Sequence, residues 1–219
     1  MHKFGLNLVT GPTVEPITIA FAKLHLRVDF DDDDTLISAL IQAAREYIEN
    51  YTNSALFAQT WLLTLDQFPY PQSFSTISPA ARDNWLGVGG YLDGMQMLLP
   101  VPKCQSVTSI TYIDGSNTQR TLDPTTYNLD INSIPARILP VDGGTWPYPA
   151  VYVSGTVQVT FVAGSYTPAT CPASLQQAML LLIGAWYGQR EAISEKPMSA
   201  VPFAVECLLA PYRNYQLVL

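Results

Sequence analysis

Basic residues are scarce in this chain. It has 219 residues, with eleven Lys and Arg against eighteen Asp and Glu, so its formal net charge is −7. Proteins that hold nucleic acid through its phosphates need clustered Lys and Arg, and here the basic residues are scattered. We therefore do not expect sequence-specific DNA binding, although an acidic surface would let DNA slide past without adhering.

Residues for common enzyme and metal chemistry are also few. The three cysteines, Cys104, Cys171 and Cys207, are far apart and form no CxxC pair, which argues against a zinc site and favours reduced thiols. Of the two histidines, His2 adjoins the first residue and His25 lies in an apolar helical segment without an evident nucleophile. No Gly-rich nucleotide-binding motif is present. We expect no catalytic residue, no cofactor and no metal site, and therefore no enzyme.

Long apolar runs are lacking as well. The longest covers residues 178–187 and is shorter than the roughly 20 residues that cross a bilayer. The N-terminal stretch MHKFGLNLVTGP has no apolar segment typical of a signal peptide. These features predict a protein made in the cytoplasm without a membrane partner. Because hydrophobic residues make up 48% of the chain and charged ones only 13%, we expect partners to cover part of the surface.

Acidic charge concentrates in one segment. Residues 24–34 read LHLRVDFDDDD and end in four consecutive aspartates, Asp31, Asp32, Asp33 and Asp34. An EF-hand calcium loop that begins at Asp29 would need Gly at its sixth position and Glu at its twelfth, and neither stands there. The aspartates precede an amphipathic segment, so a carboxylate that caps the free N–H groups of a helix is the simplest interpretation. A channel that faces DNA, an interface with a basic neighbour and an unclassified cation site remain alternatives.

Helical patterns occupy both ends of the chain. Residues 16–28 predict a short helix. Residues 36–51 predict a longer one, because apolar residues recur there at steps of three and four. Pro172 suits the first turn of a third helix, whose Gly184 and Gly188 allow close packing against another helix. A last helix is expected near residues 200–213, followed by an apolar tail.

The middle of the chain has the pattern of strands. Residues 61–65, 106–113, 126–131, 136–139 and 156–163 are rich in β-branched and aromatic residues, and Asp114-Gly115 is typical of a hairpin turn. We therefore predict an α+β fold, in which N- and C-terminal helices pack as a bundle around an inserted antiparallel β module. The expected boundaries are residues 1–55 and 166–219 for the helical parts and 56–165 for the β module.

Several segments, in order, resemble the head–tail connector proteins of tailed bacteriophages, also called adaptor or head-completion proteins, which occur in gene-transfer-agent particles too. They are residues 25–53 (HLRVDFDDDDTLISALIQAAREYIENYTN), 59–69 (QTWLLTLDQFP), 99–115 (LPVPKCQSVTSITYIDG), 127–130, 137–140, 145–147 (TWP), 159–167 (VTFVAGSYT), 185–192 (WYGQREAI) and 208–213 (LLAPYR). No single motif is specific, but their ordered set is.

The resemblance implies a structural role in the virion neck. Such proteins form a ring, typically of twelve subunits, that sits under the portal protein; DNA passes through it, and the next neck or tail-completion protein docks below. It also implies that the C-terminal tail inserts into the portal. Here the matching residues are Tyr212, Arg213, Tyr215, Leu217, Val218 and Leu219.

A second interpretation is a β module that binds a sugar or a peptide in a phage or bacterial surface assembly. Exposed aromatic rings can stack on such ligands, and Trp85, Tyr91, Trp146 and Tyr148 are the candidates. Aromatic residues packed at subunit interfaces would account for the same four residues, so the sequence leaves this alternative open.

Overall fold

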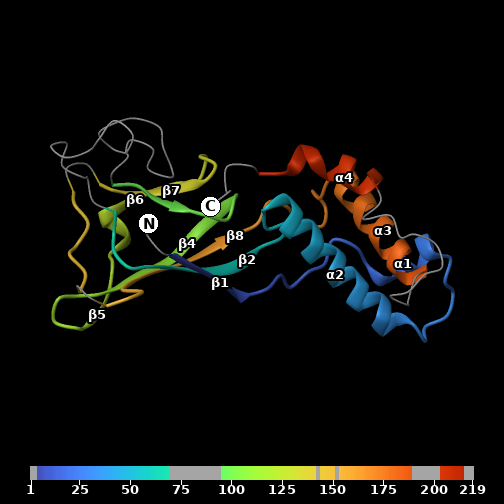
Figure 1. The fold of residues 1–219 in the computed structure, drawn as a ribbon, viewed down its shortest axis with the longest axis horizontal. Helices are drawn as coiled ribbons and strands as arrows, with labels where there is room; N and C mark the ends of the chain where they lie inside the picture. The colour runs from blue at the N-terminus through green and yellow to red at the C-terminus, as the bar shows by residue number, and fades with distance from the viewer. Residues whose placement is uncertain (1–3, 70–94, 142–143, 151–152, 189–202, 215–219) are drawn as a thin grey trace. The chain divides into compact units, whose positions relative to one another are not determined.

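Two structural units make up the chain. The computed structural model describes residues 4–69, 95–141, 144–150, 153–188 and 203–214. The β unit comprises the described parts of residues 1–11 and 59–163, and the helical unit comprises those of residues 12–58 and 164–215. Figure 1 shows the strands of the first unit and the helices of the second.

Two antiparallel sheets form the β unit. The first has the strand order β1-β2-β8-β4-β5 and the second the order β3-β7-β6. The strands of the first sheet are β1 (Phe4–Thr10), β2 (Gln59–Leu65), β8 (Val157–Ala163), β4 (Cys104–Ile113) and β5 (Gln119–Thr121). Those of the second are β3 (Met97–Leu99), β7 (Ala136–Pro140) and β6 (Tyr127–Asp130).

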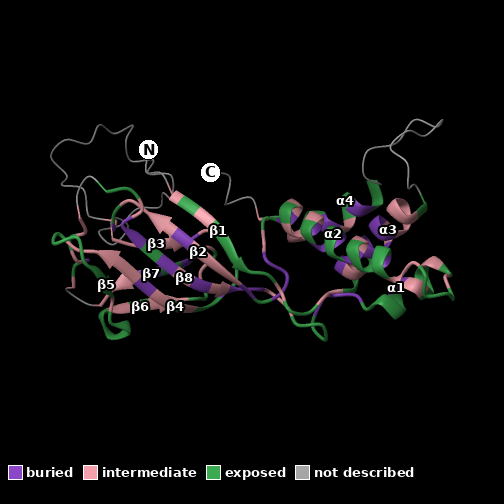
Figure 2. Ribbon diagram, turned by 90° about the horizontal axis from the view of Figure 1, so that it is seen from below, coloured by how far each residue is buried: buried purple, intermediate pink, exposed green. Residues whose placement is uncertain are grey.

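Buried and more exposed residues alternate along the strands of the β unit. In the central strand β8, Val157, Val159 and Phe161 are fully buried while the residues between them are more exposed, which is the two-residue period of a strand with one face on a core. Figure 2 shows the buried bands along the strands. The Trp146 ring stacks on Phe68 at 5.1 Å between centroids, and both side chains are buried.

The predicted hairpin turn joins β4 and β5. Ile113 pairs with Gln119, and the Asp114 carboxylate accepts hydrogen bonds from the backbone N–H groups of Ser116 and Thr118 at 2.9 and 3.0 Å. Arg120 contacts the other carboxylate oxygen at 2.8 Å. An aspartate at the start of a turn thus satisfies the backbone donors that the turn leaves unpaired.

Four α-helices form the helical unit in the described residues: α1 (Ile19–Leu26), α2 (Asp34–Thr52), α3 (Ala173–Gly188) and α4 (Phe203–Leu209). The 3-10 turn η3 (Ala210–Tyr212) follows α4. Ile37, Ile41, Ala44 and Ile48 of α2 are buried in one core with residues of the other helices. Their spacing of three and four residues matches the predicted apolar stripe.

Helix ends in this unit follow from local chemistry. The Thr18 hydroxyl accepts a hydrogen bond from the Phe21 N–H and so caps α1. Arg27 after α1 and Asn53 after α2 adopt left-handed backbone conformations, with φ of 58° and 51°, and their N–H groups satisfy carbonyls of the last helical turn.

The α+β prediction is confirmed, and its N-terminal boundary needs one correction. Residues 1–55 were expected to be helical, but Phe4–Thr10 form β1, which pairs with β2. β1 lies at the edge of the sheet, where only one side of a strand has a partner. Phe4, Leu6 and Leu8 alternate with Gly5 and Asn7, which is a short two-residue signal for this strand.

Candidate functional site

The acidic run lies between α1 and α2, and two of its four aspartates pair with one lysine. Lys23 Nζ of α1 contacts Asp31 Oδ1 at 2.5 Å and Asp34 Oδ1 at 2.8 Å. These bonds span the turn that reverses the chain between the two helices. The Asp31 and Asp34 carboxylates therefore stabilise the α1–α2 turn.

The ion pairs affect the protonation of both partners. The hydrogen bond from Lys23, and then its positive charge, lowers the pKa of Asp31. The hydrogen bonds to Asp31 and Asp34 raise the pKa of Lys23. Opposite charges at hydrogen-bonding distance favour the charged form of each group. Lys23 and Asp31 thus stay charged over a wider pH range, and the single lysine of α1 is paired within its own unit.

The helix cap predicted at the aspartates is wrong. Asp33 occupies the N-cap position of α2, but its side chain makes no capping hydrogen bond. It instead accepts a hydrogen bond from the Tyr187 hydroxyl of α3. The turn hydrogen bond from Asp34 N–H to the Asp31 carbonyl fixes the backbone at this helix start. Asp33 thus links α2 to α3. Because the two residues are far apart in sequence, no local sequence pattern predicts this contact.

Asp31 and Asp32 are both exposed, and Asp32 differs in having no lysine partner. Among the described residues it has no hydrogen bond or ion pair. Of the four aspartates, it is therefore the one whose charge is directed to solvent or to a partner.

His25 contributes no chemistry that the structure shows. Its side chain is exposed on α1 and lies beside Gly184 of α3, where an added Cβ would be 3.5 Å from His25 Nε2. The predicted helix packing at Gly184 therefore exists, whereas an added Cβ at Gly188 would meet no atom within 4 Å.

The start of the predicted docking tail is attached to the helical unit. The Tyr212 hydroxyl lies 2.7 Å from Ser174 Oγ, and the Arg213 guanidinium lies over the Tyr51 ring, 5.2 Å from its centroid. Asn214 N–H donates to the Thr52 carbonyl at 3.0 Å. The other predicted tail residues, Tyr215, Leu217, Val218 and Leu219, lie outside the described residues.

The aromatic residues proposed to bind a sugar or peptide do not form one surface. Trp146 is buried, and its Nε1 donates to the Met95 carbonyl at 2.7 Å, so its ring is part of the core. Tyr148 is 81% exposed. Trp85 and Tyr91 lie outside the described residues. Trp146 was therefore wrongly proposed as a stacking residue.

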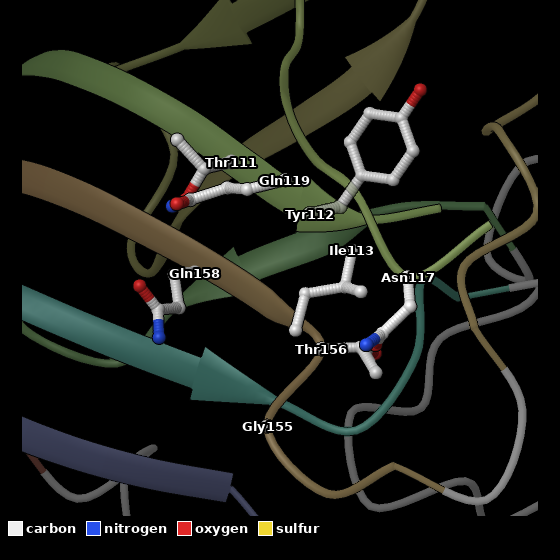
Figure 3. Close-up of a pocket in the computed structure, with 8 residues that line it drawn as sticks. All are labelled: Thr111, Tyr112, Ile113, Asn117, Gln119, Gly155, Thr156 and Gln158. Carbon is white, nitrogen blue, oxygen red and sulfur yellow. The ribbon is translucent and has the colours of Figure 1, made fainter. Parts of the chain in front are cut away.

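A pocket of about 300 Å³ lies on the β unit, at strands β4, β5 and β8. Its lining contains Gln119, Gln158, Thr111 and Asn117, and none of its eight lining residues is charged. Figure 3 shows that the Tyr112 ring points away from Gln158 and Thr156. The pocket thus offers neutral amide and hydroxyl groups without an acid, a base or a stacking ring.

The helical unit has a set of exposed apolar side chains that the sequence periodicity did not predict. Leu24 of α1 is 74% exposed, and Phe203 of α4 is 78% exposed. A signal was present in the segment IAFAKLHL, which has apolar residues on every side of the helix. Such a helix is expected to be buried on all sides, yet only Ala22 of α1 is buried within the unit.

Neither a metal site nor a membrane helix is found in the described part of the chain. No group of three or more His, Cys, Asp or Glu residues there could hold a metal ion. Among those same residues, no helix is sufficiently long and apolar to span a bilayer.

The fold as a whole is that of neck proteins from gene-transfer-agent (GTA) particles. The chain matches a protein in the neck of an empty GTA particle computed with C6 symmetry, with a TM-score of 0.68, 21% identity and 95% of each chain covered. A chain of the native GTA virion matches with a TM-score of 0.67, 22% identity and coverage of 95% and 94%. A chain in the native neck computed with C12 symmetry matches with a TM-score of 0.62 and 22% identity, again over 95% and 94% of the two chains.

The family match is more specific than the structural matches, but it covers a shorter part of the chain. Residues 16–79 match the model of the phage gp6-like head-tail connector proteins, which confirms the resemblance seen in the sequence. The matched segment includes α1, the acidic run, α2 and β2. This family is structural rather than enzymatic, so the match supports a non-catalytic connector role. No curated protein matches the chain.

Proposed function

We propose that this chain is a structural connector subunit in the neck of a tailed-phage or gene-transfer-agent particle. Copies of it form a ring of twelve between the portal protein and the next neck or tail component, and DNA passes through the ring. The observation that carries the proposal is the combination of a connector-family match at residues 16–79 with a neck-protein fold over 95% of the chain.

Symmetry supports the ring. The similar structures belong to necks computed with C6 and C12 symmetry. A symmetric assembly of identical chains needs recurring contacts between neighbours, and the exposed apolar side chains of the helical unit could supply them. The proposed stoichiometry of twelve agrees with the C12 neck.

The acidic run divides between two roles in this proposal. Asp31, Asp33 and Asp34 hold the α1–α2 turn and α3 together through Lys23 and Tyr187. Asp32 is exposed and carries its charge outward. We assign Asp32 to the surface that faces DNA, because negative charge there repels phosphates and keeps DNA from adhering.

The C-terminal tail is the proposed portal-docking segment. Tyr212 and Arg213 anchor its start on the helical unit. Tyr215, Leu217, Val218 and Leu219 would then make the contacts with the portal, because they are apolar or aromatic. Deletion of residues 216–219 is expected to weaken co-sedimentation with portal particles while the subunit still folds. Undiminished co-sedimentation would contradict this assignment.

The proposal is tested by imaging. Negative-stain electron microscopy of the purified full-length chain should show rings, and mass photometry should give the mass of twelve subunits. A labelled chain should appear at the neck of tailless particles. A protein that stays monomeric and is absent from particle necks would refute the proposed function.

A further inference from the structure

The outer face of α1 is apolar and unusually exposed. Ala20, Phe21 and Leu24 are exposed on the side of α1 opposite the buried Ala22. Phe21 is 43% exposed and Leu24 is 74% exposed. The one lysine of the helix is already neutralised by Asp31 and Asp34.

A shallow groove lies beside this face. It is lined by four apolar residues, Ile19, Ala20, Leu24 and Val28, and by four charged ones, Lys23, Asp29, Asp31 and Asp34. Its volume is about 550 Å³, which is large enough for an aromatic side chain and part of a helix. The α1 face and this groove together form what we call the α1 surface.

The helix α4 presents a second apolar stripe. Phe203 and Cys207 of α4 and Ala210 of the following turn η3 are exposed and recur at steps of four and three residues, while Val205 and Leu209 are buried in the core. Phe203 is 78% exposed. Glu206 stands at the flank of this stripe, as the helical period requires. We call Phe203, Cys207 and Ala210 the α4 stripe.

The two surfaces occupy different places on one unit. Both α1 and α4 pack against α3, and they lie apart in the two ribbon views (Figures 1 and 2). A contact between different surfaces of identical subunits leaves each surface free to bind a further copy. Such head-to-tail contacts form rings when the rotation between successive subunits closes, whereas a surface that pairs with itself gives only dimers.

We propose that the α1 surface of one subunit binds the α4 stripe of its neighbour, with Phe203 entering the groove beside Leu24. The inference rests on the proposed function, because it takes the second copy of this chain as the occupant. That choice follows from the symmetric necks that share the fold. It also follows from the match between the apolar residues of the groove, Ile19, Ala20, Leu24 and Val28, and one exposed phenylalanine on the same unit.

A native thiol makes the contact testable by cross-linking. Cys207 is free and exposed, whereas Cys104 and Cys171 are buried. The variants Leu24→Cys and Phe21→Cys each place a second thiol on the α1 surface. Oxidation of assembled rings with copper phenanthroline, or treatment with a short bismaleimide, should then produce a covalent ladder of dimers, trimers and higher oligomers on non-reducing gels.

Three controls fix the interpretation. The unchanged chain should give no ladder, because it has only one exposed cysteine among the described residues. Leu24→Cys combined with Cys207→Ser should also give none, because the neighbour then lacks the second thiol. Ile131→Cys is a matched control, since Ile131 is 45% exposed in the β unit, and it should not cross-link to Cys207.

The outcomes separate this inference from the proposed function. Rings that assemble normally but give no ladder with either Leu24→Cys or Phe21→Cys would overturn the α1–α4 contact and leave the connector role intact. Cross-linked dimers without higher oligomers would also overturn it, because they indicate a self-paired surface. A chain that forms no rings at all would overturn the connector role and this contact with it.

Assembly measurements provide a second test that does not depend on thiol geometry. Leu24→Asn and Phe203→Asn should each shift the ring–monomer midpoint to at least tenfold higher protein concentration, while circular dichroism remains unchanged. Ile131→Asn should leave the midpoint unchanged. Equal midpoints for all three variants would contradict the proposed contact.

Discussion

Arg45 is the most buried charged side chain in the described part of the helical unit. Its side chain is 6% exposed, with Nε 3.0 Å from Glu15 Oε2 and NH1 2.7 Å from Glu49 Oε2. The other Glu49 oxygen accepts a hydrogen bond from the Leu56 N–H at 2.8 Å. Arg45 thus joins the segment before α1 to the middle of α2, and Glu49 joins α2 to the segment after it.

Arg45→Ala should destabilise the helical unit by about 3 kcal/mol, because it removes the positive charge that pairs with the nearly buried Glu49 carboxylate. Urea denaturation followed by circular dichroism would measure the loss. Arg120→Ala is the matched control, since Arg120 forms an ion pair with Asp114 but its side chain is 58% exposed. Solvent screens such a pair, so no measurable change is expected. Equal effects of the two variants would contradict the structural role of Arg45.

Asp130 at the end of β6 should make the stability of the β unit depend on pH. Hydrogen bonds from Ser133 and Arg137 lower the pKa of Asp130 to about 2. An aspartate in an unfolded chain titrates near ~3.9. The folded state therefore binds the proton more weakly, and its added stability is present above pH ~4 and is lost as pH falls toward 2.

The variant Asp130→Asn tests this dependence. Urea midpoints measured from pH 6 to pH 2 should converge for the variant and the unchanged chain at the acidic end, where the Asp130 carboxylate is protonated. A constant difference across that range would show that the ionised carboxylate does not contribute. Gln119→Asn, an exposed amide change on β5, is expected to leave the pH profile unaltered.

At the scale of elements, Gly164 allows the end of one strand to approach another segment of backbone. It follows β8, and an added Cβ there would lie 2.5 Å from the Phe57 carbonyl carbon and from the Ala58 nitrogen. The neighbouring Ser165 and Tyr166 N–H groups donate to the carbonyl of Leu56. The backbone at residues 55–58 is thus held directly against residues 164–166.

Gly164→Ala should therefore destabilise the chain by at least about 2 kcal/mol, because the clash is with backbone that cannot rotate away. Thermal or urea unfolding would measure the loss. Gly115→Ala is the matched control, because an added Cβ there meets nothing within 4 Å. Wild-type stability for Gly164→Ala would contradict the close approach that the structure shows.

Elements with a complete local pattern were predictable from the sequence. The stripe of α2 and the strands β4 and β8 follow from apolar periodicity, and the β4–β5 hairpin follows from Asp114-Gly115. Features that depend on residues distant in sequence were not predictable. β1 is fixed by its pairing with β2, and Asp33 meets Tyr187 across 154 positions of sequence. Neither partner can be identified from periods of two or 3.6 residues.

The candidate site, too, could be predicted only where its features depend on residues close in sequence. The sequence identified the acidic run, but the roles of its members depend on Lys23 and on α3. The exposure of Leu24 and Phe203 was not foreseen, because an apolar residue in a helix is ordinarily assigned to the core. Only the packed unit shows that these side chains remain outside it.

For the whole molecule, the total charge depends on the number of subunits in the proposed assembly. Each chain carries a formal charge of −7, and a ring multiplies that charge by its number of subunits. In the proposed ring this field would repel DNA phosphates, most strongly where carboxylates line a channel with low-dielectric walls. Asp31 and Asp34 share the positive charge of Lys23, so the contribution of Asp32 to this field should be larger than that of Asp31 or Asp34.

Asp32→Lys is accordingly expected to make rings retain DNA. The change adds two positive charges per subunit at the surface that we assign to the channel, and phosphate contacts of this kind strengthen binding most at low salt. Filter binding of a short duplex to assembled rings should show retention near 50 mM salt that falls steeply by 200 mM. The double variant Gln119→Lys and Gln158→Lys adds the same charge on the β unit and should retain less DNA. Equal retention by both variants would indicate that DNA binding depends only on net charge. That result would contradict the assignment of Asp32 to the channel.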